Sequence, residues 1–170
     1  MGYVPWFALL LVFNNVNIFL SLSMSVLGKT KARTALEEMG AKGDFKRVES
    51  GYREWVSETH AVYKPEIGRY HLYISKACPW ADRCNTVRHL KGLTDIVSLS
   101  VVHPTWKKSR PGDAEDSHHG WAFASESDPD VVPPSGTGAI PCTGCIPDPH
   151  YNAKFVRDLY DMVDDKIGKY

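Results

Sequence analysis

The fold is decided by residues 69–81, RYHLYISKACPWA, which join a strand to a helix. Residues 69–75 are rich in aromatic and branched side chains, a composition that predicts a β-strand. After a two-residue loop the pattern becomes helical over residues 79–91, and Gly92 is placed to end that helix. These residues therefore predict a strand followed by a helix, with one short connection between them.

A second strand is predicted over residues 96–102, an apolar run that only Ser98 and Ser100 interrupt. Strand, helix of about a dozen residues and strand make a βαβ unit, and the two strands of such a unit run parallel. The sequence therefore predicts an α/β fold around this unit, with flanking helices and long loops.

Cys78 lies where the first strand ends and the helix begins. The first turn of a helix offers unpaired N–H groups and the positive end of the helix dipole, and both stabilise a thiolate. Pro79 suits the first helical position, where its missing N–H costs nothing. Because a thiolate is the nucleophile of thiol–disulfide exchange, this position favours a redox-active cysteine over a buried structural one.

A second thiol close to Cys78 is missing from this motif. A CxxC motif would place one at position 81, which is Ala81. Cys84 comes six residues after Cys78, which is about 240° around the helix, so it does not share a face with it. We expect Cys84 to be packed as an apolar residue. An external thiol must then complete the exchange, and glutathione is the obvious candidate.

Cys142 and Cys145 form a CxxC motif in a turn-rich stretch. As half of a zinc site the motif would need further ligands, for which His118, His119 and His150 are available in the sequence. As a redox pair it would need a helix to begin after the first cysteine, and prolines and a glycine surround it instead. Loop cysteines without a function are the favoured interpretation, with a metal site or a labile disulfide as alternatives.

The overall composition excludes several classes of protein. The 170 residues hold 20 basic and 20 acidic side chains, so no basic excess recommends a nucleic-acid partner. Four cysteines are too few for a disulfide framework in a chain of this length. We therefore expect a reducing, cytoplasmic setting for the catalytic part.

The first 28 residues contain no Asp, Glu, Lys or Arg. Residues 4–27 are long enough to form an apolar helix across a bilayer, although the asparagines at positions 14, 15 and 17 weaken that interpretation. A signal peptide with a cleavage site near residues 21–23 is the rival, and a non-native leader is the third alternative. The basic residues from Lys29 onward would keep the rest of an anchored chain in the cytosol.

Three segments follow from this pattern: an apolar leader at 1–28, an arm at 29–68, and an α/β domain at 69–170. In the arm we expect a short polar helix at 29–39 and isolated aromatic anchors, namely Phe45, Tyr52, Trp55 and Tyr63. Residues 103–151 read as loops and residues 151–166 as a helix. Trp121 in this loop region either pins the loop to the core or forms a wall of a ligand site, and composition alone favours pinning.

Several of these motifs together resemble the glutathionyl-hydroquinone reductases, the Xi-class (omega-like) glutathione transferases. The resemblance covers residues 32–170 and includes Gly43, Phe45 and Trp55 of the arm, whereas the leader has no counterpart. The motifs that carry it are residues 68–75, 77–81, 91–93, 98–104, 120–121 and 153–160.

The resemblance implies the N-terminal, thioredoxin-like part of such a transferase, with glutathione as co-substrate and no metal. Cys78 would attack the sulfur of a glutathionyl-hydroquinone, release the hydroquinone and retain glutathione as a mixed disulfide. A second glutathione would then regenerate the thiol. Trp121 matches the family tryptophan that contacts glutathione, which reverses the preference for pinning alone.

The resemblance also identifies family elements that these 170 residues lack. They are a strand that ends in Val-Pro with a cis proline, a Glu-Ser pair that holds glutathione, and an all-helical C-terminal domain that contributes to a homodimer. We therefore expect a truncated product that keeps the nucleophile, with impaired activity. The alternative from another class is a non-catalytic, membrane-tethered interaction module, for which residues 4–27 would supply the attachment.

Overall fold

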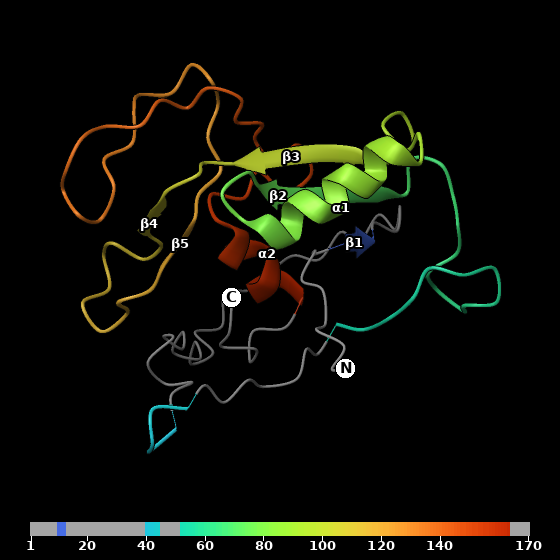
Figure 1. Ribbon diagram of the computed structural model, residues 1–170, viewed down its shortest axis with the longest axis horizontal. Helices are drawn as coiled ribbons and strands as arrows, with labels where there is room; N and C mark the ends of the chain where they lie inside the picture. The colour runs from blue at the N-terminus through green and yellow to red at the C-terminus, as the bar shows by residue number, and fades with distance from the viewer. Residues whose placement is uncertain (1–9, 13–39, 45–51, 164–170) are drawn as a thin grey trace, which may run out of the picture. The chain divides into compact units, whose positions relative to one another are not determined.

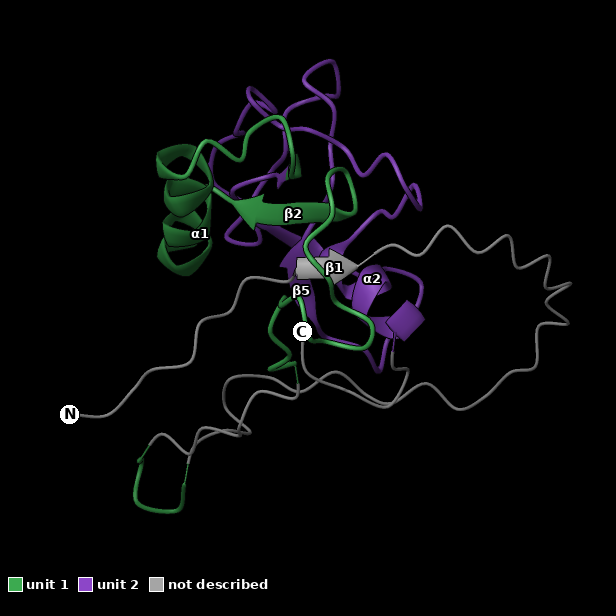
Figure 2. Cartoon of the chain, turned by 90° about the vertical axis from the view of Figure 1, so that its right-hand side faces the viewer, with its two compact units in different colours: residues 1–13, 34–100 green, residues 14–33, 101–170 purple. Residues whose placement is uncertain are grey.

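The computed structural model describes residues 10–12, 40–44 and 52–163. The chain divides into two compact units, which Figure 2 colours separately. Unit 1 contains the described residues up to Ser100, and unit 2 contains those from Val101 onward. The predicted helix at residues 29–39 and the arm residue Phe45 lie outside the described residues.

The predicted strand–helix–strand unit is confirmed. Strand β2 (Tyr70–Ser75) leads into helix α1 (Pro79–Leu90), and strand β3 (Ser98–Val102) follows. β2 and β3 are neighbours in one sheet, and their arrows point the same way beneath α1 in Figure 1. All six residues of β2 are buried, whereas Ala81 is the one buried residue of α1. The sheet, more than the helix, therefore carries the packing of this unit.

A third strand, β1 (Leu10–Val12), pairs antiparallel with β2, Leu10 lying opposite Leu72 and Val12 opposite Tyr70. These three residues fall inside the segment predicted as an apolar helix, so that prediction is wrong here. A short run of aliphatic residues fits a strand as well as a helix, and the free edge of β2 supplies backbone partners that decide the outcome. The rest of the leader lies outside the described residues.

The two serines that interrupt the second apolar run have a structural role. The imidazole of His71 on β2 is buried, and its Nδ1 and Nε2 atoms lie 2.6 Å from Ser98 Oγ and 2.8 Å from Ser100 Oγ. A buried imidazole needs a hydrogen-bond partner at each nitrogen, and β3 provides one at each serine. This polar contact fixes the two strands in register.

Hydrogen bonds from side chains to backbone carbonyls, more than aromatic anchors, fasten the described end of the arm to the start of β2. Tyr70 donates its hydroxyl to the Lys64 carbonyl at 2.6 Å, and Arg69 donates to the Val62 carbonyl at 2.7 Å. Trp55 is 83% exposed, so the predicted anchor is wrong at that position. Its indole contributes little buried surface there, while the side chains of Arg69 and Tyr70 hold the preceding carbonyls.

Unit 2 has more structure than the long loops predicted for it. Strands β4 (Trp106–Lys108) and β5 (His119–Trp121) form a two-stranded antiparallel ribbon. Isolated bridges join Val101 to Ile146, Ala122 to Phe155 and Val131 to Ile140. Helix α2 (Val156–Val163) lies within the predicted helix, and its start is fixed by Asp158, whose carboxylate accepts the Lys154 and Phe155 N–H groups.

Within the residues that the structure describes, none of the helices combines the length and apolar character required to cross a membrane.

Candidate functional site

Cys78 is the residue that precedes the first turn of α1. Its backbone is extended (φ −103°, ψ 107°), and Pro79 occupies the first helical position, as the sequence predicts. The Cys78 carbonyl accepts the Asp82 N–H at 3.1 Å and so begins the helical ladder, while its own N–H donates to the Ser75 carbonyl at 3.0 Å. The Cys78 side chain is half-buried and makes no capping hydrogen bond to the helix. The thiol therefore lies at the start of the helix without a hydrogen bond to the first helical turn.

The strand before Cys78 explains how the thiol is held in place. Ser75 is the buried last residue of β2, and its hydroxyl accepts the Ala77 N–H at 3.2 Å. The connection from Ser75 to Cys78 is thus closed by one side-chain and one backbone hydrogen bond. A short, hydrogen-bonded turn between a buried strand and a helix is a rigid support for a reactive group.

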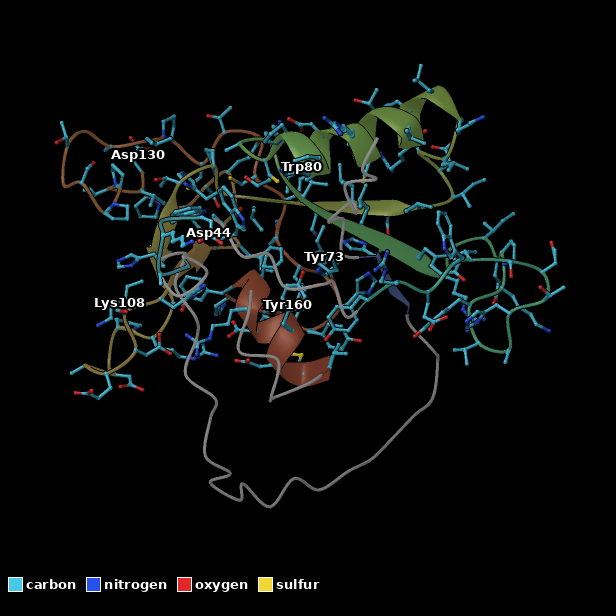
Figure 3. All side chains as sticks on the ribbon, turned by 60° about the horizontal axis from the view of Figure 1, so that its bottom comes forward. Asp44, Tyr73, Trp80, Lys108, Asp130 and Tyr160 are labelled. Atoms are coloured by element: carbon cyan, nitrogen blue, oxygen red, sulfur yellow. The ribbon has the colours of Figure 1, made fainter. Side chains whose placement is uncertain are left out.

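Trp80 and Cys84 complete the surroundings of the thiol on α1. Trp80 lies in the first turn (Figure 3), and the guanidinium of Arg83 sits over its ring at 4.6 Å from the centroid. Cys84 is half-buried and hydrogen-bonds through its sulfur to the Trp80 carbonyl at 3.7 Å. Burial raises the pKa of the Cys84 thiol, and charge on Cys78 raises it further. Both effects shift Cys84 toward the neutral thiol, and the residue is half-buried where the sequence predicts a packed one.

Trp121 is the last residue of β5, in unit 2. It lies directly opposite Trp106 on β4, and the two indoles meet edge to face with centroids 5.5 Å apart. Trp121 is half-buried and Trp106 is 52% exposed. A Cβ at the preceding Gly120 would lie 2.7 Å from the His118 ring, which explains a glycine at this point of the ribbon. Trp121 is thus a well-supported, partly accessible aromatic surface.

The structure places the two predicted site residues in different units. Cys78 is brought together with Cys84 and the first turn of α1 in unit 1, and Trp121 is brought together with Trp106 in unit 2. Trp106 was not predicted as part of the site, because its contact with Trp121 depends on the pairing of β4 with β5.

Cys142 and Cys145 are buried, with exposed fractions of 2% and 4%, in a cluster with Ala124 and Val131. Among the described residues, no three His, Cys, Asp or Glu side chains gather in an arrangement that could hold a metal. The zinc alternative for this motif therefore finds no further ligands in His118, His119 or His150.

A buried charge network in unit 2 was also missed. Arg157 on α2 has only 2% of its side chain exposed and pairs with Asp116 at 2.6 Å. It also donates to Ser109 Oγ at 3.1 Å, and that hydroxyl lies 2.8 Å from His118 Nδ1. Burial alone would raise the pKa of Asp116, but the His118 backbone N–H and the Arg157 guanidinium outweigh it and lower this pKa. Burial and the charge of Arg157 lower the pKa of His118. The network joins the β4–β5 connection to α2.

Comparison with known proteins identifies relatives of one kind. No protein-family model matches the chain. It is 36% identical to glutathione S-transferase omega-like 2 of Saccharomyces cerevisiae over 76% of this chain and 40% of that protein. It is 37% identical to the glutathionyl-hydroquinone reductase PcpF of Sphingobium chlorophenolicum over 74% of this chain and 36% of that protein.

A solved structure of a protein of the same kind is also similar to this chain. The Xi glutathione transferase ECM4 of Saccharomyces cerevisiae, crystallised in complex with glutathione, is 33% identical and superposes with a TM-score of 0.52. The match covers 70% of this chain and 36% of that one. These relatives are all transferases or reductases, so the comparisons give no support to a non-catalytic interaction module.

The chain spans between about a third and two fifths of the length of these relatives. Over some seven-tenths of its residues, the chain is therefore related in sequence and in α/β fold to the Xi-class glutathione transferases, which include the omega-like transferases and the glutathionyl-hydroquinone reductases.

Proposed function

We propose that this chain carries the nucleophilic part of a glutathione-dependent oxidoreductase that reduces glutathionyl-hydroquinones, with Cys78 as the reacting thiol. The observation that carries the proposal is the position of Cys78. It is half-buried, it precedes the first turn of α1, and its side chain makes no capping hydrogen bond to the helix. The first turn of the helix offers N–H groups and the positive end of the helix dipole to a group at this position.

The reaction proceeds in two steps, the formation of a mixed disulfide on Cys78 and its cleavage by a second glutathione. The Cys78 thiolate attacks the glutathione sulfur of the conjugate, so that an S–S bond forms and the bond between sulfur and the aromatic carbon breaks. The aromatic carbon takes the electron pair and then a proton, which gives the hydroquinone. A second glutathione thiolate attacks the mixed disulfide, releases oxidised glutathione and restores the Cys78 thiolate.

Glutathione is the co-substrate that fits this chemistry, because Cys84 does not serve as a resolving thiol. Its raised pKa lowers the fraction of its thiolate, which is the form that acts in exchange. We assign Trp121 to the contact with glutathione. Its half-buried indole, supported edge-on by Trp106, offers a flat surface against which a peptide can pack.

The proposal also covers where the catalytic part is located and how the chain is organised. The reaction consumes reduced glutathione, so we place the catalytic part in the cytosol, where the glutathione pool keeps thiols reduced. The segments 1–28, 29–68 and 69–170 are proposed as leader, arm and catalytic domain. A homodimer is proposed for longer relatives only.

The test uses oxidised glutathione and site-resolved mass spectrometry of the full chain. We expect one glutathione bound to Cys78, removable by a reductant, and no label at position 78 in the Cys78→Ser variant. Cys84→Ser serves as the matched control, and it should keep the Cys78 adduct. Labelling of Cys84 in preference to Cys78 would contradict the proposal. A Trp121→Ala variant should bind glutathione more weakly, whereas unchanged affinity would remove Trp121 from the site.

A further inference from the structure

The CxxC motif of unit 2 is not used by the proposed reaction, although both cysteines are buried at one place. The Cys145 N–H donates to the Cys142 carbonyl at 3.0 Å, which closes a four-residue turn. Gly144, the third residue of the turn, has φ +75°, the conformation that a type II turn requires and that glycine adopts without strain.

This turn brings the Cα atoms of the two cysteines to a separation that a disulfide bond can span. The first and last Cα atoms of a β-turn are less than about 7 Å apart, and disulfide bonds span Cα distances of about 4.4–6.8 Å. Both side chains belong to one buried cluster with Ala124 and Val131, so they lie on the same side of the turn. No large backbone movement is needed to join them.

The segment that carries the turn is clamped at both ends. Ile140 exchanges two backbone hydrogen bonds with Val131, at 2.8 and 2.9 Å, and Ile146 exchanges two with Val101, at 2.8 and 3.0 Å. The Gly144 N–H also donates to Glu126 Oε1 at 2.6 Å. The turn is therefore preorganised, which favours closure of a bond across it.

One of the two cysteines also lines a cavity of about 260 Å³ within unit 2. Cys142 contributes to its wall, together with Lys107, Phe123 and the acidic loop that contains Asp130, which is labelled in Figure 3. Cys145 is not among the lining residues. Cys142 is therefore the cysteine of the pair that borders the cavity.

We propose that Cys142 and Cys145 form a second, independent thiol–disulfide site that is oxidised by low-molecular-weight disulfides. The Cys142 thiolate attacks one sulfur of oxidised glutathione, which forms a mixed disulfide and releases one glutathione. The Cys145 thiolate then attacks the Cys142 sulfur, closes the intramolecular disulfide and releases the second glutathione. The two cysteines lose two electrons and two protons, and one oxidised glutathione becomes two reduced ones.

The experiment uses the full chain with Cys78→Ser and Cys84→Ser, so that its outcome does not depend on the proposed function. The protein is treated with oxidised glutathione, then alkylated and weighed intact and as peptides. We expect a loss of two hydrogens, protection of both remaining thiols from alkylation, and recovery of both thiols by a reductant. Two alkylatable thiols after treatment, or a mixed disulfide that persists on Cys142, would overturn the proposal.

Single substitutions in that background test the order of attack. Cys145→Ser should accumulate a mixed disulfide at Cys142, whereas Cys142→Ser should remain unlabelled. A mixed disulfide on Cys145 at comparable yield would overturn the order of attack.

Gly144→Ala places a side chain in the left-handed region and should lower the equilibrium constant for closure by up to about tenfold. Thr143→Ala, in the same turn, is the matched control and should leave closure unchanged. Equal closure in the two variants would contradict the role of the turn. Circular dichroism establishes that each variant keeps the fold of the parent.

Discussion

His71 Nε2 lies 2.8 Å from Ser100 Oγ, and neither residue has more than 1% of its surface exposed. The contact joins β2, which leads to Cys78, to its neighbour β3. Because both groups are buried, each depends on hydrogen bonds within the protein in place of those with water.

Replacing His71 by leucine should therefore destabilise unit 1. We expect the free energy of unfolding to fall by about 2–3 kcal/mol, since the buried Ser100 hydroxyl loses its contact with His71 and a packed ring is lost. Denaturant unfolding followed by circular dichroism measures this change. Ser98→Ala is the control: Ser98 is exposed, so its loss should cost about 1 kcal/mol or less. Equal costs for the two variants would show that burial of the contact is unimportant.

The buried ion pair between Arg157 and Asp116 predicts strongly coupled substitutions. Arg157→Met should cost about 3 kcal/mol, because it leaves the Asp116 carboxylate buried without its partner at 2.6 Å. The double variant Arg157→Met/Asp116→Leu should recover part of that loss, since no unpaired charge remains. Chemical denaturation of the two single variants and the double variant completes the cycle. Additive costs would contradict a direct pairing of these charges.

His118 predicts a loss of stability in mild acid. Its pKa is lowered from 6.5 in the fold by burial and by the charge of Arg157, so the unfolded chain binds a proton that the folded chain resists. The free energy of unfolding should therefore fall as the pH drops below 6.5 and down to the lowered pKa. Urea titrations between about pH 7.5 and about pH 5.5 measure this slope. His118→Gln should flatten it, and an unchanged slope in that variant would assign the effect to another group.

The alkylation of Cys84 should depend on the charge of Cys78. Burial raises the pKa of Cys84 above its ordinary value of 9.0, and charge on Cys78 raises it further. At a given pH, Cys84 therefore holds less thiolate than an unfolded cysteine does. The pH midpoint of Cys84 alkylation should therefore lie above that of an unfolded cysteine. It should move downward in Cys78→Ser, where the second cause is removed while burial remains. A midpoint unaffected by that substitution would mean that the two thiols do not interact.

The local parts of the fold were the ones that sequence could predict. Residues 70–75 form one run of mainly aromatic and branched side chains, and Cys78-Pro79 marks the start of a helix. Strand β2 and helix α1 therefore agree with the prediction to within one residue. Strands β4 and β5 were missed because three residues carry no period of their own, and each forms only by pairing with the other. Strand β1 was missed for the same reason.

In the candidate site, too, sequence could predict the features that depend on neighbouring residues and not those that depend on strand pairing. Cys78 could be predicted because strand, loop, cysteine, proline and helix follow one another in the chain. The support of Trp121 by Trp106 could not be predicted, because it depends on the register of two strands about a dozen residues apart. The burial of Arg157 was equally hidden, since its partners Asp116 and Ser109 come from a stretch that reads as loop.

The most direct test of the account is a single turnover with a glutathionyl-hydroquinone and no free glutathione, using the chain with Cys142→Ser and Cys145→Ser. We predict release of one hydroquinone per chain together with one glutathione bound to Cys78, and neither product from the same chain carrying Cys78→Ser as well. Release of hydroquinone without a Cys78 adduct, or its persistence in the Cys78→Ser chain, would contradict the assignment of Cys78 as the nucleophile.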